Sequence, residues 1–210
     1  IDSRPPFGNH HAMNRWHGVC FGIWISLAAL GAEKISSGRI ATGTQWETIF
    51  YQRDSGQPGP VVVLTGGIHG SEPAGAAAAE HIRHWPIARG KLIVIPRANV
   101  PGLRNGTRFM PGEPPQLRDL NRQFPKTKAP PGAKGVLAKA LWEFIGKQKP
   151  DWVIDLHEGF DFHQLNSKSV GSTIIDAKGK AADAVVPLML AAVNAGIAAA
   201  AYATRINFIS

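Results

Sequence analysis

Three short, continuous apolar runs constrain the fold of this chain more than any other feature of its sequence. They are Val61 to Thr65 (VVVLT), Lys91 to Pro96 (KLIVIP) and Trp152 to Leu156 (WVIDL). An apolar, β-branched run that does not alternate with polar residues is typical of a strand buried on both faces of a sheet. Because helix-length segments separate these runs, the sequence predicts an α/β fold: a mostly parallel or mixed central sheet with helices on both faces.

The remaining elements are predicted from periodicity and from turn residues. We expect an edge strand, a fourth buried strand and a last strand cut off at the end of the chain, at residues 46–52, 172–175 and 205–210 respectively. We expect helices at residues 73–85, 133–149 and 181–201. An irregular loop at 97–131 joins the second strand to the middle helix, and loops of that length are usually functional.

The first 32 residues do not fit this domain pattern. Residues 1–12 lack periodicity and begin with Ile1, so we interpret them as an upstream or non-native segment. Residues 13–32 combine a weakly basic start, an apolar run from Val19 to Leu30 and small residues, which predicts a signal peptide. The alternative is a buried helix. The apolar run is shorter than the roughly 20 residues that span a membrane, so we expect no stable membrane anchor and an exported, periplasmic or extracellular protein. The remaining domain is then 33–210, and we expect it to be incomplete at its C-terminus.

The charge of the chain bears on its partners. The formal net charge is +8, which favours nucleic acid, an anionic surface or a carboxylate substrate. The basic residues are scattered and form no nucleic-acid motif, so we expect a small anionic substrate and no nucleic acid. The one cysteine, Cys20, lies in the predicted signal segment, so the domain is stabilised without disulfides.

A candidate metal site lies where two of the apolar runs end. His69 and Glu72 form an H-x-x-E pair after the first run, and His157 directly follows the third. The carboxyl ends of parallel strands meet at one edge of a sheet, where ligands bind. Two imidazoles and one carboxylate with an open fourth position form a catalytic zinc site, so we predict one Zn²⁺. The alternative is that Glu72 caps a helix beside a hydrogen-bonded loop histidine.

Other ionisable residues near these positions have lesser roles. Asp155, two residues before His157, either orients that histidine or is a buried carboxylate satisfied elsewhere. His81 and His84 follow Glu72 by more than two helical turns, so we expect them to be solvated. His163 is expected in the wall of the site.

Four segments carry a family resemblance. They are GGIHGSEPAG (66–75), NVPGLRNGTRF (99–109), RDLNRQFP (118–125) and DLHEG (155–159). In this order they resemble the succinylglutamate desuccinylase/aspartoacylase family, within the zinc carboxypeptidase-like superfamily. The resemblance implies that His69, Glu72 and His157 hold zinc, that Asn121 and Arg122 grip a substrate carboxylate, that Arg108 polarises the scissile carbonyl or binds substrate, and that Asp119 orients the arginines.

The resemblance also implies an activity and raises a difficulty. We expect a zinc-dependent hydrolase that cleaves an amide bond next to a substrate carboxylate, either an N-acyl amino acid deacylase or a carboxypeptidase. The family's general base is a Glu beyond the last zinc ligand, and no Glu follows Glu158 in this sequence. Either the chain stops before its base, or Glu158 substitutes for it. The alternative function is a non-catalytic module that binds a peptide or carboxylate and lacks the base.

Overall fold

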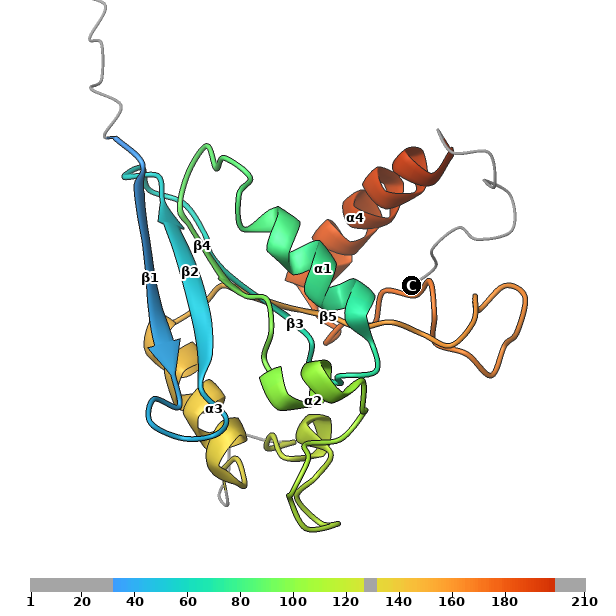
Figure 1. Cartoon of the computed structure of the whole chain (residues 1–210). Helices are drawn as coiled ribbons and strands as arrows, with labels where there is room; N and C mark the ends of the chain where they lie inside the picture. Colours follow the sequence, from blue (N-terminus) through green and yellow to red (C-terminus); the bar gives the residue numbers. More distant parts are fainter. Residues whose placement is uncertain (1–31, 127–131, 199–210) are drawn as a thin grey trace, which may run out of the picture.

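The computed structural model describes residues 32–126 and 132–198. Its elements lie in the order β1 (Lys34–Ile40), β2 (Thr48–Asp54), β3 (Val61–Gly66), α1 (Pro73–Ile82), β4 (Lys91–Ile95), α2 (Val100–Asn105), the 3₁₀ helix η1 (Leu120–Arg122), α3 (Val136–Gln148), β5 (Trp152–Leu156) and α4 (Lys180–Ala198). One five-stranded sheet runs through this part of the chain (Figure 1). The predicted upstream segment, signal peptide and last strand lie outside the described residues, save Ala32 at the end of the signal range.

The sheet is mixed, with strand order β1-β2-β4-β3-β5. The three apolar runs form its parallel part, in which β3 pairs with β4 on one side and with β5 on the other. β1 and β2 add antiparallel strands beyond β4. The α/β fold with a mostly parallel or mixed sheet is therefore confirmed.

The strand predicted at 46–52 exists, but the prediction that it is an edge strand is wrong. It corresponds to β2, which is an inner strand between β1 and β4. The edge strand on this side of the sheet is β1, which the sequence pattern did not predict. Its side chains are mostly exposed and only Ile40 is buried, so β1 is held through backbone pairing that leaves no apolar signature in the sequence.

Helices cover both faces of the sheet, as expected. Leu137 and Leu141 of α3 pack with Val63 and Ile93 in one core. On the opposite face, Ala79 of α1 packs with residues that include Leu64 of β3. Successive side chains of a strand point to opposite faces, so β3 contributes to both cores, and this is why its sequence is continuously apolar.

β5 was expected to be buried on both faces, and this prediction is wrong. Trp152, Ile154 and Leu156 are half-buried, whereas Val153 is 53% exposed. Within the described chain β5 is an edge strand. The side of β5 that carries Trp152, Ile154 and Leu156 faces the core beneath α1, while its other side is open.

The region after β5 also departs from expectation. Residues 172–175 form no continuous strand: Thr173 is a single bridge position, and Gly171 forms an isolated bridge with Phe162. Ser172 has a φ of 55°, which an extended strand does not allow. The helix expected at 181–201 is α4, and the helix expected at 73–85 ends at Ile82.

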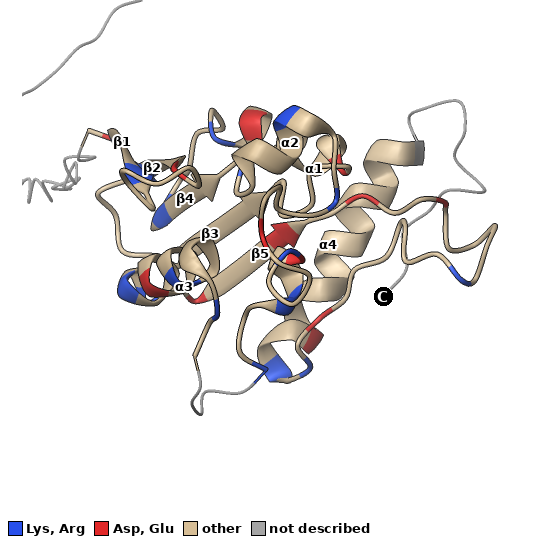
Figure 2. Cartoon of the chain, turned by 60° about the horizontal axis from the view of Figure 1, so that its bottom comes forward, with Lys and Arg blue, Asp and Glu red and all other residues tan. Residues whose placement is uncertain are grey.

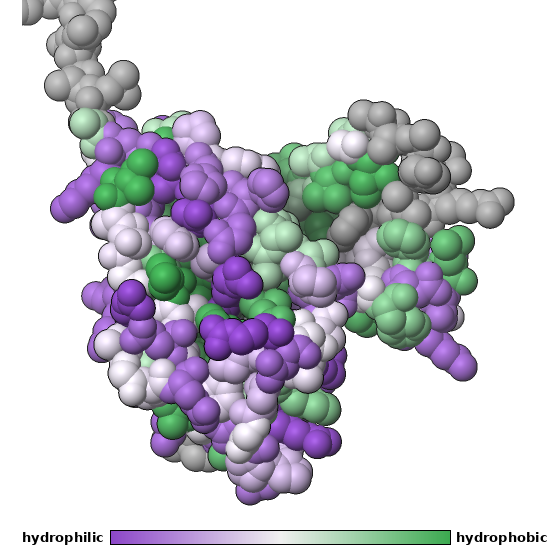
Figure 3. Space-filling view, viewed as in Figure 1, coloured by the Kyte–Doolittle hydropathy of each residue, from purple (hydrophilic) through white to green (hydrophobic). Residues whose placement is uncertain are grey.

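α4 and the loop before it expose apolar side chains to solvent. Leu188 is 69% exposed, and Figure 3 shows hydrophobic residues over α4 and the loop before it. By length and composition alone α4 could cross a membrane, a test that core helices of soluble proteins and signal sequences also pass.

Candidate metal centre

The loop between β3 and α1 carries the first two candidate ligands. His69 follows the end of β3 and is 2% exposed, and Glu72 occupies the N-cap position of α1. Glu72 donates its backbone N–H to the carbonyl of His69 at 3.2 Å, which closes a tight turn between them. Pro73 at the first helical position has the φ that a helix requires, so the chain enters α1 directly after Glu72.

The parallel pairing of β3 with β5 brings the third candidate ligand to the same place. Gly66 and Leu156 are register partners, and His157 is the next residue along β5's path. The Nδ1 atoms of His69 and His157 lie 2.7 Å from Glu72 Oε1 and Oε2 respectively. One donor atom from each of the three residues can be chosen so that all lie within 4.8 Å of one another. The structure thus brings together the three residues that the sequence singled out.

The second nitrogen of each imidazole faces a carboxylate. His69 Nε2 lies 3.2 Å from Asp119 Oδ1, and His157 Nε2 lies 2.7 Å from Asp155 Oδ2. Metal-bound histidines usually direct their other ring nitrogen to such a partner, which fixes the ring and leaves one nitrogen free for the ion. This donor set fits a metal ion, and the Nδ1 atoms of the two histidines would hold it together with Glu72.

These contacts perturb two ionisation equilibria. The hydrogen bond with Asp155, the partly opposing effect of burial and the charges of Asp155 and Glu72 together raise the pKa of His157 to about 9. For Glu72, burial pushes the pKa upward, but hydrogen bonds from His157 and the Glu158 backbone, with the charges of His69 and His157, outweigh it and lower the pKa. Both pKa shifts favour the charged forms of Glu72 and His157, whose Oε2 and Nδ1 atoms lie 2.7 Å apart.

Arg108 lies at the rim of the three-residue group. Its Nη1 donates to Glu72 Oε1 at 3.1 Å, its Nε lies 3.7 Å from Asp119 Oδ2, and its side chain is 41% exposed. Asp119 therefore contacts the arginine that it was expected to orient, and it also contacts His69. A half-exposed guanidinium at the mouth of the site can donate to a ligand oxygen that enters from solvent.

Asn121 and Arg122 lie in η1, next to Asp119. The Asp119 side chain caps this short helix by accepting from the Asn121 N–H at 3.1 Å. Arg122 is exposed, and its Nη1 donates to the Asn121 carbonyl at 3.3 Å. The cap ties this pair to the residue that holds His69.

Glu158 has a different partner from the one that a general base requires. Its Oε2 accepts a hydrogen bond from the Ala74 N–H at 3.0 Å, in the first turn of α1. A carboxylate is stabilised there by the unpaired N–H groups of the helix end. Its own backbone N–H donates to Glu72 Oε2 at 3.3 Å. Glu158 thus links the end of β5 to the start of α1.

Two buried polar residues near the site were not singled out from the sequence. Asn99 is fully buried, caps α2 by accepting from the Gly102 N–H at 3.0 Å, and donates to the Ile68 carbonyl at 3.4 Å. It supports the loop that carries His69. Asn followed by Val-Pro-Gly is an N-cap signal that the sequence contained. The other is Thr65, for which the sequence contained no signal.

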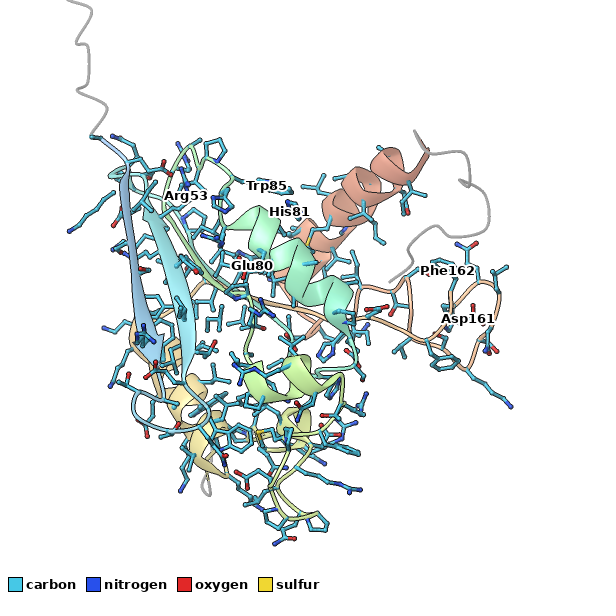
Figure 4. The ribbon with its side chains drawn as sticks, viewed as in Figure 1. Arg53, Glu80, His81, Trp85, Asp161 and Phe162 are labelled. Carbon is cyan, nitrogen blue, oxygen red and sulfur yellow. The ribbon has the colours of Figure 1, made fainter. Side chains whose placement is uncertain are left out.

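The other histidines lie apart from the three-residue group. His81 is exposed in the last turn of α1, far along the helix from Glu72 (Figure 4). His84, also exposed, follows the helix, and His163 has its Nδ1 at 2.6 Å from the Ser169 carbonyl in the loop that projects beyond β5. Lysines and arginines are dispersed over several elements (Figure 2).

The fold and these contacts define an α/β protein with a candidate mononuclear metal site at the carboxyl ends of its parallel strands. The sequence profile of the succinylglutamate desuccinylase/aspartoacylase catalytic domain matches residues 58–171, and the chain belongs to that family. The match includes all three candidate ligands, Arg108, and the Asn121–Arg122 pair.

Individual relatives agree with this assignment. An N-alpha-acetyl-L-2,4-diaminobutyric acid deacetylase from Halomonas elongata is 32% identical over 104 residues, which is 48% of this chain and 29% of the deacetylase. A candidate metallopeptidase from Shewanella baltica has a TM-score of 0.53 at 21% identity, covering 78% of this chain and 61% of the other. A succinylglutamate desuccinylase from a Silicibacter species has a TM-score of 0.51 at 20% identity, covering 80% and 51%. These two structures show the fold. The chain spans less than a third of the deacetylase's length.

Proposed function

We propose that this protein is a zinc-dependent hydrolase that cleaves an amide bond adjacent to a substrate carboxylate. The observation that carries the proposal is the arrangement of His69, Glu72 and His157, in which two Nδ1 atoms face one carboxylate while each Nε2 is held by an aspartate. Two imidazoles and one carboxylate leave an open position, which distinguishes a catalytic zinc site from a structural one. Bound there, zinc would polarise the amide carbonyl and lower the pKa of a coordinated water.

The surrounding side chains suit an anionic substrate. The segment 97–126, which borders the site, carries six basic residues against two acidic ones: Arg97, Arg104, Arg108, Arg118, Arg122 and Lys126, against Glu113 and Asp119. A guanidinium binds a carboxylate through two donors, which suits Arg122 with Asn121 to the recognition of an anionic end. In this proposal Arg108 would donate to the oxygen that gains charge as the amide carbonyl is attacked.

The relative from Halomonas elongata supports an N-acyl amino acid over a peptide. Its name describes a deacetylase of an N-acetylated diamino acid. Such a substrate has both an amide and a carboxylate, the two groups that the site would engage. We therefore take N-acyl amino acids as the first substrate class for this chain and peptides as the second.

A second candidate is a carboxylate-binding module without hydrolytic activity. It is favoured by the contacts of the four carboxylates around the site in the described residues. Glu72 faces both histidines, Asp119 and Asp155 hold their second nitrogens, and Glu158 accepts from the Ala74 N–H. None of these contacts leaves a carboxylate poised as the base that hydrolysis requires.

The test has two stages. The full chain is refolded with zinc, dialysed, and its metal content is compared with that of His69→Ala, which removes a ligand, and of His81→Ala, an exposed histidine outside the site. We expect about one zinc in wild type and in H81A, and a loss of at least about 100-fold in affinity in H69A. Equal zinc in H69A and wild type would exclude the metal site.

The second stage measures hydrolysis of N-acetyl amino acids, starting with N-α-acetyl-L-2,4-diaminobutyrate, and of short peptides. Release of acetate that depends on zinc and falls in Arg108→Ala supports the hydrolase. Zinc binding together with saturable ligand binding but no turnover would assign the binding module instead. Glu158→Gln tests whether Glu158 substitutes for the family's general base. Unchanged turnover in this variant would exclude Glu158 from proton transfer.

A further inference from the structure

A buried threonine lies directly behind the aspartate that holds His157. Thr65 of β3 is 4% exposed, and its Oγ1 donates to Asp155 Oδ1 at 2.6 Å. Thr65 and Asp155 are register partners on neighbouring parallel strands, so their side chains stand on the same face of the sheet. The other oxygen of the same carboxylate, Oδ2, faces His157 Nε2 at 2.7 Å. Thr65, Asp155 and His157 therefore form one hydrogen-bonded chain that ends at a candidate metal ligand.

We propose that Thr65 is a positioning residue for the metal site, acting through Asp155. Its hydroxyl holds one carboxylate oxygen, so the other is directed at His157 Nε2 and the imidazole presents Nδ1 to the ion. The inference rests on the proposed function, because it assigns a role in binding the metal that the function requires.

The exposure of this part of the site explains why such a support is needed. The side chains of Asp155 and His157 are each 33% exposed, on an edge strand, whereas that of His69 is 2% exposed. A half-exposed aspartate can rotate about two side-chain torsions unless something holds it. Thr65 belongs to the core strand β3 and has a β-branched side chain with restricted χ1, so its hydroxyl has a fixed direction. The rigid part of the sheet thereby orients a ligand on its exposed edge.

A merely structural role for the hydroxyl is the competing explanation, and the chain contains a matched control for it. Thr48 of β2 is 2% exposed and donates its Oγ1 to the Arg97 carbonyl at 2.7 Å. Thr48 and Thr65 thus have similar burial and similar hydrogen bonds, but only Thr65 is bonded to a partner of a candidate metal ligand. Thr→Val at either position removes a hydroxyl while keeping the branched shape.

The experiment measures zinc affinity by competition with a chromophoric chelator, and apo-protein stability by denaturant unfolding, in the full chain. We expect Thr65→Val to weaken zinc binding about tenfold, in the range seen when partners of metal ligands are removed. Thr65→Ser keeps the donor and is expected to stay within about threefold of wild type. Thr48→Val is expected to lower apo stability about as much as T65V and to leave zinc affinity unchanged.

A double-mutant cycle tests whether Thr65 acts through Asp155. In an Asp155→Asn background, adding T65V should change zinc affinity by less than about twofold, because the group that Thr65 orients is no longer a carboxylate. If T65V does not fold, Thr65→Cys, which has a weak donor, takes its place in every comparison.

Each outcome decides the inference. Zinc affinity in T65V equal to wild type, an equal loss in T48V, or full additivity of T65V with D155N would overturn it. If zinc binds and H69A abolishes binding while T65V has no effect, the inference fails and the proposed function stands. If wild type binds no zinc, both fail.

Discussion

Two valines that face each other across the sheet differ sharply in their surroundings. Val63 of β3 and Val153 of β5 are register partners on neighbouring parallel strands. Val63 is fully buried in the core that α3 covers, whereas Val153 is 53% exposed. The same residue type, on the same face and about one strand spacing apart, thus marks the boundary between a buried half of the sheet and an open one.

The candidate metal site lies across this boundary. His69 belongs to the buried half, on a loop that Asn99 holds by donating a hydrogen bond to the Ile68 carbonyl. His157 belongs to the open half, at the end of the edge strand. Folding of the core would hold His69 with little freedom, whereas the orientation of His157 depends on hydrogen bonds from its neighbours. A bound ion would therefore stabilise the β5 side more than the β3 side.

The largest expected difference between the two halves is in the free energy of unfolding when each of the two valines is replaced by alanine. Val63→Ala removes buried methyl groups and leaves a cavity, and should lower the free energy of unfolding by about 1.5–3 kcal/mol. Val153→Ala removes the same atoms from an exposed position and should change it by less than about 0.5 kcal/mol. Urea unfolding of the two variants gives the difference. Equal losses would show that β5 is as buried as β3 in solution.

A second test concerns the place where α1 packs against β5, between the buried and the open half of the sheet. A Cβ at Gly75 of α1 would lie 2.3 Å from the Leu156 carbonyl oxygen, so Gly75→Ala must push β5 away from the helix. Overpacking of this kind costs about 1–3 kcal/mol, and here it should also weaken zinc binding because it moves His157 from Glu72.

The matched control is Gly146→Ala in α3, where an added Cβ would meet nothing within 4 Å. This substitution should raise stability by up to about 1 kcal/mol and leave zinc affinity unchanged, since alanine favours helix more than glycine. A G75A variant that binds zinc as tightly as G146A would show that the ligands tolerate the displacement.

The last test concerns a pH dependence that belongs to the open half. In the metal-free chain the pKa of His157 is raised from 6.5 to about 9, chiefly by its hydrogen bond with Asp155. A raised pKa in the folded state means that this stabilisation is complete below about pH 6.5 and is lost as the pH rises towards and through 9. Unfolding measured with a chelator present should therefore show falling stability over this window.

His157→Gln should remove that slope, and His81→Gln, at an exposed histidine outside the site, should retain it. A slope that persists in H157Q would assign the titration to another group.

Part of the fold and of the site could be predicted from residues alone. The continuous apolar runs around Val63 and Ile93 indicated strands of an α/β sheet, because a strand buried on both faces has no polar positions. The H-x-x-E spacing of His69 and Glu72 and the place of His157 after another strand brought the three to one sheet edge. The family assignment, made from the motifs, is confirmed by the comparisons.

Other features depend on pairing and packing between distant segments. The sequence Trp152 to Leu156 predicted burial on both faces, yet Val153 is exposed, because burial is set by what covers a strand and not by its own residues. β1 was missed because backbone hydrogen bonds to β2 need no apolar pattern. The contact of Glu158 with the Ala74 N–H joins residues 84 positions apart, and no local spacing indicates it.

By itself the sequence determined which side chains are candidate metal ligands and that they follow strands of one sheet, since residue type and strand periodicity are local properties. Only the tertiary structure decided which imidazole nitrogen faces Glu72 and which carboxylate holds each ring. It also decided that one candidate ligand, His69, is buried and another, His157, is exposed. The physical reason is that orientation and burial arise from strand register and helix packing, which bring Thr65 to Asp155 and leave the far side of β5 open.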